Sequence, residues 1–178
     1  HIKTQGNNGM RVMVSSWARI DSRSLPIHAK ATANYANSAL ARIEAIKSGV
    51  DEAIMLNMSG MVVEGTAENI FMVKNKVLVT PPLTSGALDG ITRLTVLSIA
   101  EHLGINFQIS DISRDELYYA DEVFLTGTAA EIKSIGEIDK IIIANGKVGK
   151  IATKLQNLYY QIVHGEIKKF EKWLTYIN

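Results

Sequence analysis

Lys30 is the first residue of the 178-residue chain whose setting could support chemistry. It follows a short loop with Pro26 and directly precedes an alanine-rich amphipathic pattern over residues 33–47. A lysine held on a rigid element can lose its hydration and act as an amine nucleophile. The alternative is an ordinary solvated surface lysine, which is the commoner situation for this residue type.

Residues 64–69 (EGTAEN) form a second candidate segment, with two acids and an asparagine between two apolar stretches. A turn at the end of a strand exposes its side chains towards a cleft. Glu64 in such a place could bind a cationic nitrogen of a ligand. The alternative is a solvated turn in which Glu68 and Asn69 bond nearby backbone amides.

Two further segments could bind an anion. Residues 86–93 (GALDGITR) place Gly90 just before an expected helix, and a helix N-terminus offers free amides to a phosphate, here with the Thr92 hydroxyl beside them. Residues 125–130 (LTGTAA) join a strand to a turn whose successive amides could form an anion-binding nest. The alternatives are Asp89 acting as a simple helix cap and a tight turn without a ligand.

These segments must be positioned by strands and helices that alternate irregularly. The patterns predict helices over 33–47, 91–103 and from 151 onward, the last broken near Gly165, and strands over 10–17, 53–58, 61–63, 69–73, 77–80, 106–110, 122–126, 133–135 and 140–144. This order favours a mixed α/β layered domain over a bundle or a sandwich. The first helix is indicated by apolar residues that recur at spacings of three and four, namely Ala33, Ala36, Leu40, Ile43 and Ile46.

Composition narrows the functional classes. With 47% apolar and 21% charged residues, the chain has the balance of a soluble globular domain. It has no cysteine, which excludes a disulfide scaffold, a zinc ribbon and a thiol nucleophile. The histidines lack metal-ligand spacing, so no metal is expected. The net charge of +1 indicates no nucleic-acid partner, and the short apolar runs indicate no membrane segment, so we expect a cytoplasmic protein.

Taken in chain order, three motifs resemble the signature of the fold-type IV, pyridoxal-phosphate-dependent aminotransferases. They are Glu64-x-Thr66-x-x-Asn69-Ile70-Phe71, Leu78-x-Thr80 and Leu88-x-Gly90-Ile91-x-Arg93. Residues 29–35 (AKATANY), 80–85 (TPPLTS) and 126–131 (TGTAAE) are most similar to the branched-chain amino acid aminotransferase group of that family. The resemblance covers roughly residues 10–178. It implies a mixed α+β fold, with a pseudo-barrel of mixed strands flanked by helices.

The resemblance also implies a role for individual residues. Lys30 matches the lysine that forms a Schiff base with pyridoxal 5'-phosphate and moves the substrate α-proton, and Glu64 matches the acid facing the pyridine nitrogen. The other matches are Tyr35 at the phenolic oxygen, Leu88 against the ring, Ile91, Thr92 and Thr128 at the phosphate, Arg19 near the cofactor, and the amides of Thr128 and Ala129 at the substrate carboxylate.

The implied activity is transfer of the amino group of leucine, isoleucine or valine to 2-oxoglutarate by a homo-oligomer, either a dimer or a hexamer. A D-amino acid aminotransferase, an aminodeoxychorismate lyase and a truncated, non-catalytic fragment are the alternatives. We expect residues 1–9 to be a linker or a remnant of an interdomain loop, residues 10–178 to be the cofactor-binding large domain, and the family's small N-terminal domain to be absent. Ala67 departs from the pattern, because close bacterial relatives have glycine there.

Overall fold

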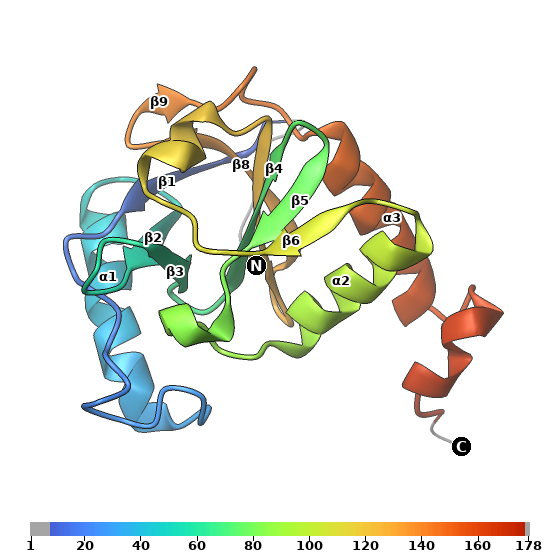
Figure 1. Cartoon of the computed structure of the whole chain (residues 1–178), viewed down its shortest axis with the longest axis horizontal. Coiled ribbons are helices and arrows are strands. Elements are labelled where there is room, and N and C mark those ends of the chain that lie inside the picture. The colour runs from blue at the N-terminus through green and yellow to red at the C-terminus, as the bar shows by residue number, and fades with distance from the viewer. Residues whose placement is uncertain (1–7, 177–178) are drawn as a thin grey trace.

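One sheet that curls back on itself dominates the computed structural model, which describes residues 8–176 (Figure 1). Its strands in the described part of the chain are β1 (Met10–Val14), β2 (Glu52–Leu56), β3 (Val62–Gly65), β4 (Asn69–Lys74), β5 (Val77–Thr80), β6 (Phe107–Ile109), β7 (Glu122–Gly127), β8 (Glu131–Ile138) and β9 (Ile141–Ile142). The helices are α1 (Tyr35–Lys47), α2 (Ile91–His102) and α3 (Lys150–Val163). Short 3-10 helices cover Thr32–Asn34, Leu83–Ser85, Asp115–Tyr119 and Lys168–Trp173.

The sheet closes into a small barrel. Its strands run in the order β3-β2-β1-β8-β7-β4, and β4 pairs back with β3 where Glu64 faces Asn69. Beyond this ring, β5 and β6 continue from β4, and β9 pairs with β8. The β1 strand lies parallel to both β2 and β8, whereas the other pairs in the ring are antiparallel. The predicted pseudo-barrel of mixed strands is therefore confirmed, and the segment 64–69 lies at its closure.

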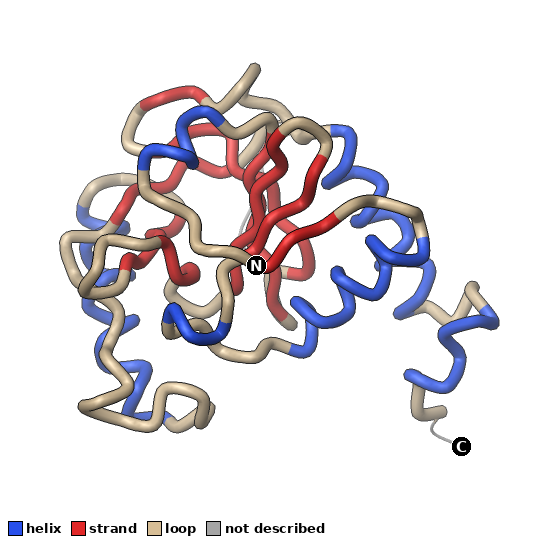
Figure 2. The backbone as a smooth tube through the Cα atoms, viewed as in Figure 1, coloured by secondary structure: helices blue, strands red, loops and turns tan. Residues whose placement is uncertain are grey.

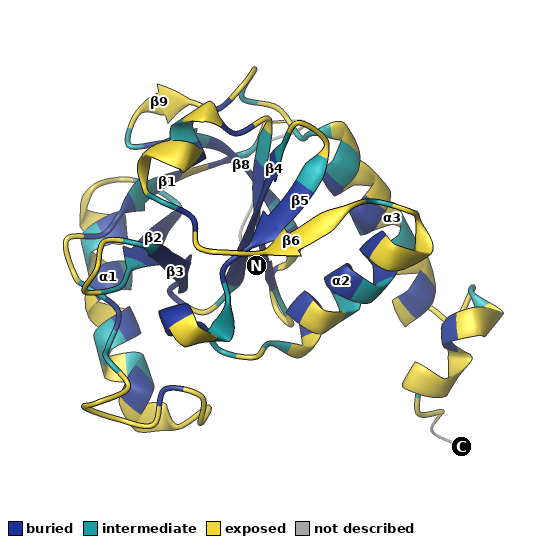
Figure 3. Ribbon diagram, in the orientation of Figure 1, coloured by how far each residue is buried: buried dark blue, intermediate teal, exposed yellow. Residues whose placement is uncertain are grey.

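Three clusters of buried apolar side chains hold the barrel and its helices together. The helices lie outside the strands (Figure 2), and many of the buried residues lie on the strands (Figure 3). The first cluster fills the barrel interior with side chains such as Val12, Ile70 and Leu125. The second lies between the sheet and helices α2 and α3, where the Phe71 and Phe124 rings stack with centroids 5.3 Å apart. The third seats α1 on β2 through small side chains. Helices on the outside thus cover two separate parts of the barrel wall.

The predicted helix α1 is present, but its periodic apolar residues lie on the exposed side. Leu40, Ile43 and Ile46 are 41%, 49% and 61% exposed, and the helix instead buries Ser38, Ala41 and Ala45. Small side chains allow α1 to lie close to β2, so the side of the helix with Ser38, Ala41 and Ala45 packs against the barrel. The apolar stripe remains on the outer side. Spacing shows that a helix is two-sided, but it does not show which side the rest of the chain covers.

The other elements lie where the patterns place them, with shifted ends. β1 stops at Val14, three residues earlier than expected, because the Ser15 hydroxyl and the Ser16 amide both donate to the Glu44 carboxylate on α1. β8 is longer than expected and spans residues 131–138. The expected linker 1–9 falls mostly outside the described residues. Within residues 8–176, the helices are too short or too polar to traverse a bilayer.

Candidate functional site

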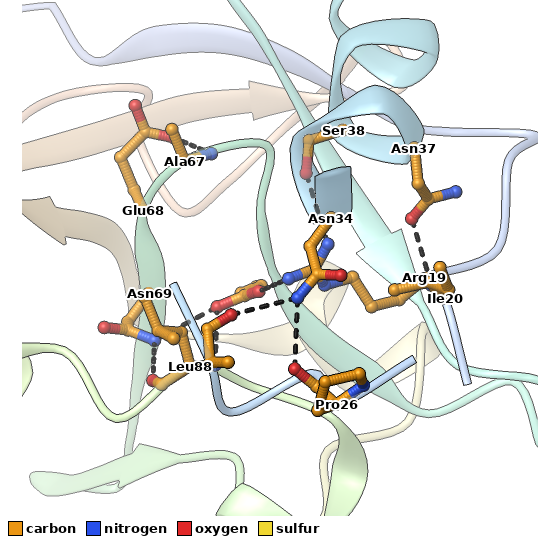
Figure 4. Close-up of polar contacts among 12 residues, drawn as sticks. Arg19, Ile20, Pro26, Asn34, Asn37, Ser38, Ala67, Glu68, Asn69 and Leu88 are labelled. Atoms are coloured by element: carbon orange, nitrogen blue, oxygen red, sulfur yellow. Dashed lines mark hydrogen bonds and ion pairs between the residues drawn. The ribbon is translucent and has the colours of Figure 1, made fainter. Parts of the chain in front are cut away.

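A buried ion pair lies at the barrel closure. Glu64 Oε1 is 2.8 Å from Arg19 Nη2, and both side chains are less than one-tenth exposed. The other carboxylate oxygen, Oε2, accepts hydrogen bonds from the Leu88 amide at 3.0 Å and from the Asn69 side chain at 3.2 Å (Figure 4). Residues from β3, β4 and two loops therefore fix one carboxylate in a single orientation.

Burial and charge act on Glu64 in opposite directions. Loss of hydration raises the pKa of the Glu64 carboxyl, while the Arg19 guanidinium and the Leu88 amide lower it. Arg19 is held in turn by the Ser38 hydroxyl on α1 at 3.2 Å. A carboxylate that is buried but compensated in this way can stabilise a positive charge or hold a proton on a nitrogen placed beside it.

Five of the residues singled out from the sequence surround a small cavity next to this ion pair. Its volume is about 30 Å³, and Arg19, Lys30, Tyr35, Glu64 and Leu88 all line it, together with Ala67. Such a volume holds about one water molecule. A ligand the size of an aromatic ring must therefore lie across the open side of the cavity. The other predicted residues, Ile91, Thr92, Thr128 and Ala129, do not line it.

Lys30 lies on an exposed loop. Between Asp21 and Ala33 only Ile27 is buried, and Lys30 itself is exposed, as in the alternative of a solvated surface lysine. The loop is nevertheless tied down. Asn34 is buried, and its side-chain amide donates to the carbonyl oxygens of Pro26 at 3.1 Å and Ala29 at 2.9 Å. No sequence motif pointed to Asn34, although an asparagine directly before a helix often bonds nearby backbone groups.

The N-terminus of α2 opens at Gly90, which occupies the cap position. In the described chain, no side chain at the cap position accepts a hydrogen bond from the free amides of this first turn. The Ile91 side chain is exposed, whereas Thr92 is buried. The alternative that Asp89 caps the helix is wrong, because its carboxylate lies 3.7 Å from Arg93 instead. The turn keeps its amides available for an anion, as a helix N-terminus can.

Thr128 and Ala129 are exposed in the turn between β7 and β8. This turn adjoins the closure of the barrel, since Thr126 is paired with Asn69 across β7 and β4. A Cβ atom on Gly127 would lie 3.4 Å from Glu68 Cγ and 3.5 Å from the Ala67 carbonyl oxygen. The α2 N-terminus adjoins the same closure through Asn69 and Gly90. The fold thus gathers the other three candidate segments around residues 64–69.

The chain matches a known protein family. Residues 2–138 match the family model described as amino-transferase class IV. The chain belongs to this family. Its curated relatives include a probable branched-chain-amino-acid aminotransferase of Aquifex aeolicus, 48% identical over 170 residues that make up 95% of this chain and 55% of the relative. The chain therefore spans about half the length of the curated relatives it matches.

Solved structures of branched-chain amino acid aminotransferases superpose closely on this one. The T.th. enzyme, complexed with N-(5'-phosphopyridoxyl)-L-glutamate, gives a TM-score of 0.94 at 44% identity over 97% of this chain and 57% of that one. The enzyme of Thermoproteus uzoniensis with norvaline gives 0.92 at 50% identity, over 96% and 56%. At these identities the fold and the placement of the shared motifs agree.

Asn69 is expected from the sequence at most to bond nearby backbone amides in a solvated turn, but it is buried and donates to two other groups. Besides Glu64, it holds the Leu88 carbonyl at 2.8 Å, and so joins the acid to the loop that leads into α2. Gly90 has an ordinary backbone conformation, with φ at −74°, so conformational freedom does not explain a glycine there. Space does: a Cβ atom at this position would lie 2.0 Å from Asn69 Oδ1.

Gly90→Ala should therefore displace the Asn69 side chain from both of its partners. We expect the free energy of unfolding to fall by about 1–3 kcal/mol, as is common when a packed site is overfilled. Denaturant titration measures the loss. Adding Gly90→Ala to Asn69→Ala should cost much less, because the clash is gone. Equal costs in the two backgrounds would show that Asn69 is not what excludes the methyl group.

Proposed function

We propose that this chain is the cofactor-binding part of a branched-chain amino acid aminotransferase. It would take pyridoxal 5'-phosphate and help transfer the amino group of leucine, isoleucine or valine to 2-oxoglutarate, yielding the 2-oxo acid and glutamate. The names of its relatives support this choice over a D-amino acid aminotransferase or an aminodeoxychorismate lyase. The phosphopyridoxyl-glutamate in one relative and the norvaline in another support the cofactor and an aliphatic substrate.

The buried Glu64 carboxylate is the observation that carries the proposal. The chemistry that pyridoxal phosphate supplies when bound is an aldehyde that bonds amines and a ring that delocalises an electron pair. The donor set fits this group, because Glu64 can hold a proton on the ring nitrogen and Leu88 offers an apolar side chain at the same cavity. Burial raises the pKa of Glu64, and the Arg19 guanidinium opposes this rise and so favours the carboxylate form.

Lys30 and Tyr35 also line this cavity. The Lys30 amine would hold the aldehyde of the cofactor and, when the substrate amine releases it, would carry a proton away from the substrate α-carbon. The Tyr35 hydroxyl would donate to the phenolic oxygen of the cofactor. The bonds from Asn34 to the Pro26 and Ala29 carbonyls hold the loop that presents the amine.

Anionic groups of the ligands would be held by neutral donors. The open amides of Ile91 and Thr92, with the hydroxyls of Thr92 and Thr128, would bind the phosphate. The amides of Thr128 and Ala129 would bind the substrate carboxylate. Arg93 lies in the first turn of α2, but its guanidinium donates to the Pro81 carbonyl and faces Asp89, so it is already engaged.

We further propose a homo-oligomer, a dimer or a hexamer, that acts in the biosynthesis of branched-chain amino acids in the cytoplasm. The exposed apolar side chains of α1, Leu40, Ile43 and Ile46, support self-association, because they form an uncovered stripe along one side of that helix. Residues that the relatives carry outside the matched half are candidates for covering the exposed Lys30 loop.

Exchange of the leucine α-proton in D₂O tests the proposal on the chain itself. We expect the chain with pyridoxal phosphate to exchange L-leucine faster than free cofactor does, yet to show little full transamination. Precise orientation can supply roughly 7–11 kcal/mol of a reaction barrier, and an exposed Lys30 loop forgoes part of it. Proton NMR follows the exchange, and a coupled glutamate assay follows the transfer.

Each alternative predicts a different result in the same experiment. Faster exchange of D-leucine than of L-leucine would favour the D-amino acid aminotransferase. Release of pyruvate from aminodeoxychorismate, without exchange of leucine, would favour the lyase. A chain that accelerates none of these reactions above free cofactor would be the non-catalytic fragment.

A further inference from the structure

A second buried glutamate, Glu52, lies at the start of β2 beneath the turn that follows Glu64. Its side chain is 3% exposed, and no sequence motif points to it. One carboxylate oxygen, Oε1, accepts the Thr66 hydroxyl at 2.7 Å and the Ala53 amide at 2.8 Å. Charge-assisted hydrogen bonds of this kind are stronger than neutral ones. Glu52 on β2 therefore anchors the middle of the 64–69 segment through its hydrogen bond from Thr66.

The other oxygen of Glu52 faces helix α1. Arg42 Nη1 lies 3.4 Å from Glu52 Oε2 and also donates to the Asp51 carbonyl. Arg42 is on the helix that begins at Tyr35, just after the Lys30 loop. The Glu52 side chain thus joins the element that carries one half of the candidate site to the turn that carries the other half.

We propose that Glu52 is a positioning residue, which fixes the turn of residues 65–68 against β2 and α1 and so sets the shape of the cavity between Glu64 and Lys30. This inference rests on the proposed function where it concerns the cofactor. Its structural part concerns only the described residues. Glu52 touches neither the cavity nor the reacting atoms, and it acts through Thr66 and Arg42.

The charge on Glu52 also reaches the outer side of the turn. Glu68 lies over Gly65, where its Oε2 would be 2.9 Å from an added Cβ atom, and it accepts the Ala67 amide at 3.1 Å. Burial and the negative charge of Glu52 raise the pKa of Glu68 to about 7, with Glu64 acting in the same direction and Arg42 in the opposite one. Gly127, the neighbour from β7, is uncharged.

The raised pKa of Glu68 makes the stability of the folded chain depend on pH. The folded chain holds the Glu68 proton more tightly than an unfolded chain, so this group adds stability at low pH and loses it as the pH rises from about 4.5 to about 7. Removing the charge of Glu52 should lower the pKa of Glu68 and shrink this loss. A residue that only filled space would leave the titration unchanged.

The test uses Glu52→Ala, Glu52→Gln and a control, Glu122→Ala. Glu122 also binds two backbone amides, those of Ile151 and Ala152, but at the start of α3. In Glu52→Ala we expect hydrogen exchange at the Gly65 and Ala67 amides, and the dissociation constant for pyridoxal phosphate, to rise about tenfold. Glu52→Gln can still accept the Thr66 hydroxyl, so it should stay within about fivefold, because a partly exposed ion pair contributes little.

Carboxyl NMR completes the test by following Glu68. Its titration midpoint should fall in both Glu52 variants and stay near that of the original chain in Glu122→Ala. An unchanged midpoint together with unchanged amide exchange at Gly65 and Ala67 would overturn the inference. If Glu52→Ala does not fold, the midpoint in Glu52→Gln decides. A wild-type chain that binds no pyridoxal phosphate would refute the proposed function, while exchange and titration would still decide the role of Glu52.

Discussion

Borohydride treatment of the chain with pyridoxal phosphate is expected to leave a stable pyridoxyl group on Lys30 and on no other lysine. The reason is geometric. Lys30 lines the same cavity as Glu64 and Tyr35, so a ring held at Glu64 brings its aldehyde to this amine and not to the lysines outside the cavity. Peptide mapping by mass spectrometry identifies the labelled residue.

Lys30→Ala should abolish the label and reduce leucine α-proton exchange to the rate of free cofactor. General acid–base catalysis by a positioned side chain contributes about 10²- to 10⁴-fold, and this variant loses it entirely. Lys47→Ala is the matched control, since Lys47 is an exposed lysine at the C-terminal end of α1, the helix that follows the Lys30 loop. Labelling of another lysine in the unmodified chain would remove the basis for the proposed mechanism.

The sequence predicts the elements and the closing segment well because both depend on local patterns. A continuous apolar run marks strands such as β4, and the glycines after α1 and α2 mark where those helices end. The acid at position 64 is visible because it stands in a motif between two strands. The predicted open amides at the start of α2 likewise follow from Gly90 alone.

Contacts between distant parts of the chain could not be predicted in this way. The buried face of α1 depends on the close approach to β2, and its own spacing points to the exposed stripe instead. Arg19 and Glu64 form an ion pair although they are 45 positions apart in the sequence. Glu52 contacts Thr66 and Arg42 only in the closed barrel. A charged residue with no motif around it gives no sign of its partner.

The exposure of Lys30 has a similar origin. Its place before a helix predicts a rigid setting, and Asn34 does supply one. Rigidity is not burial, however, because burial requires other segments to cover the loop. Among the described residues only Ile27 anchors that loop in the interior. The sequence pattern therefore predicts where the Lys30 amine lies better than it predicts how exposed that amine is to water.

Glu64→Gln is expected to slow removal of the leucine α-proton roughly a hundredfold, which corresponds to about 2.7 kcal/mol of transition-state stabilisation. The amide keeps the shape of the side chain but carries no negative charge. A ring nitrogen beside it would lose the partner that favours its proton. Arg19 would also lose the carboxylate that lies 2.8 Å away, and an uncompensated buried cation repels a protonated nitrogen.

Two measurements separate this electrostatic role from a structural one. The ¹⁵N chemical shift of labelled pyridoxal phosphate reports directly whether the ring nitrogen is protonated, and it should change in Glu64→Gln. Glu68→Gln is the control, because Glu68 lies on the same turn and lines the same cavity but makes no ion pair with Arg19 in the described chain. It should leave the shift unchanged. If both variants slow the reaction equally and neither moves the ¹⁵N shift, Glu64 serves only to hold the turn, and the burial of its ion pair with Arg19 stabilises the barrel closure without acting on the ring.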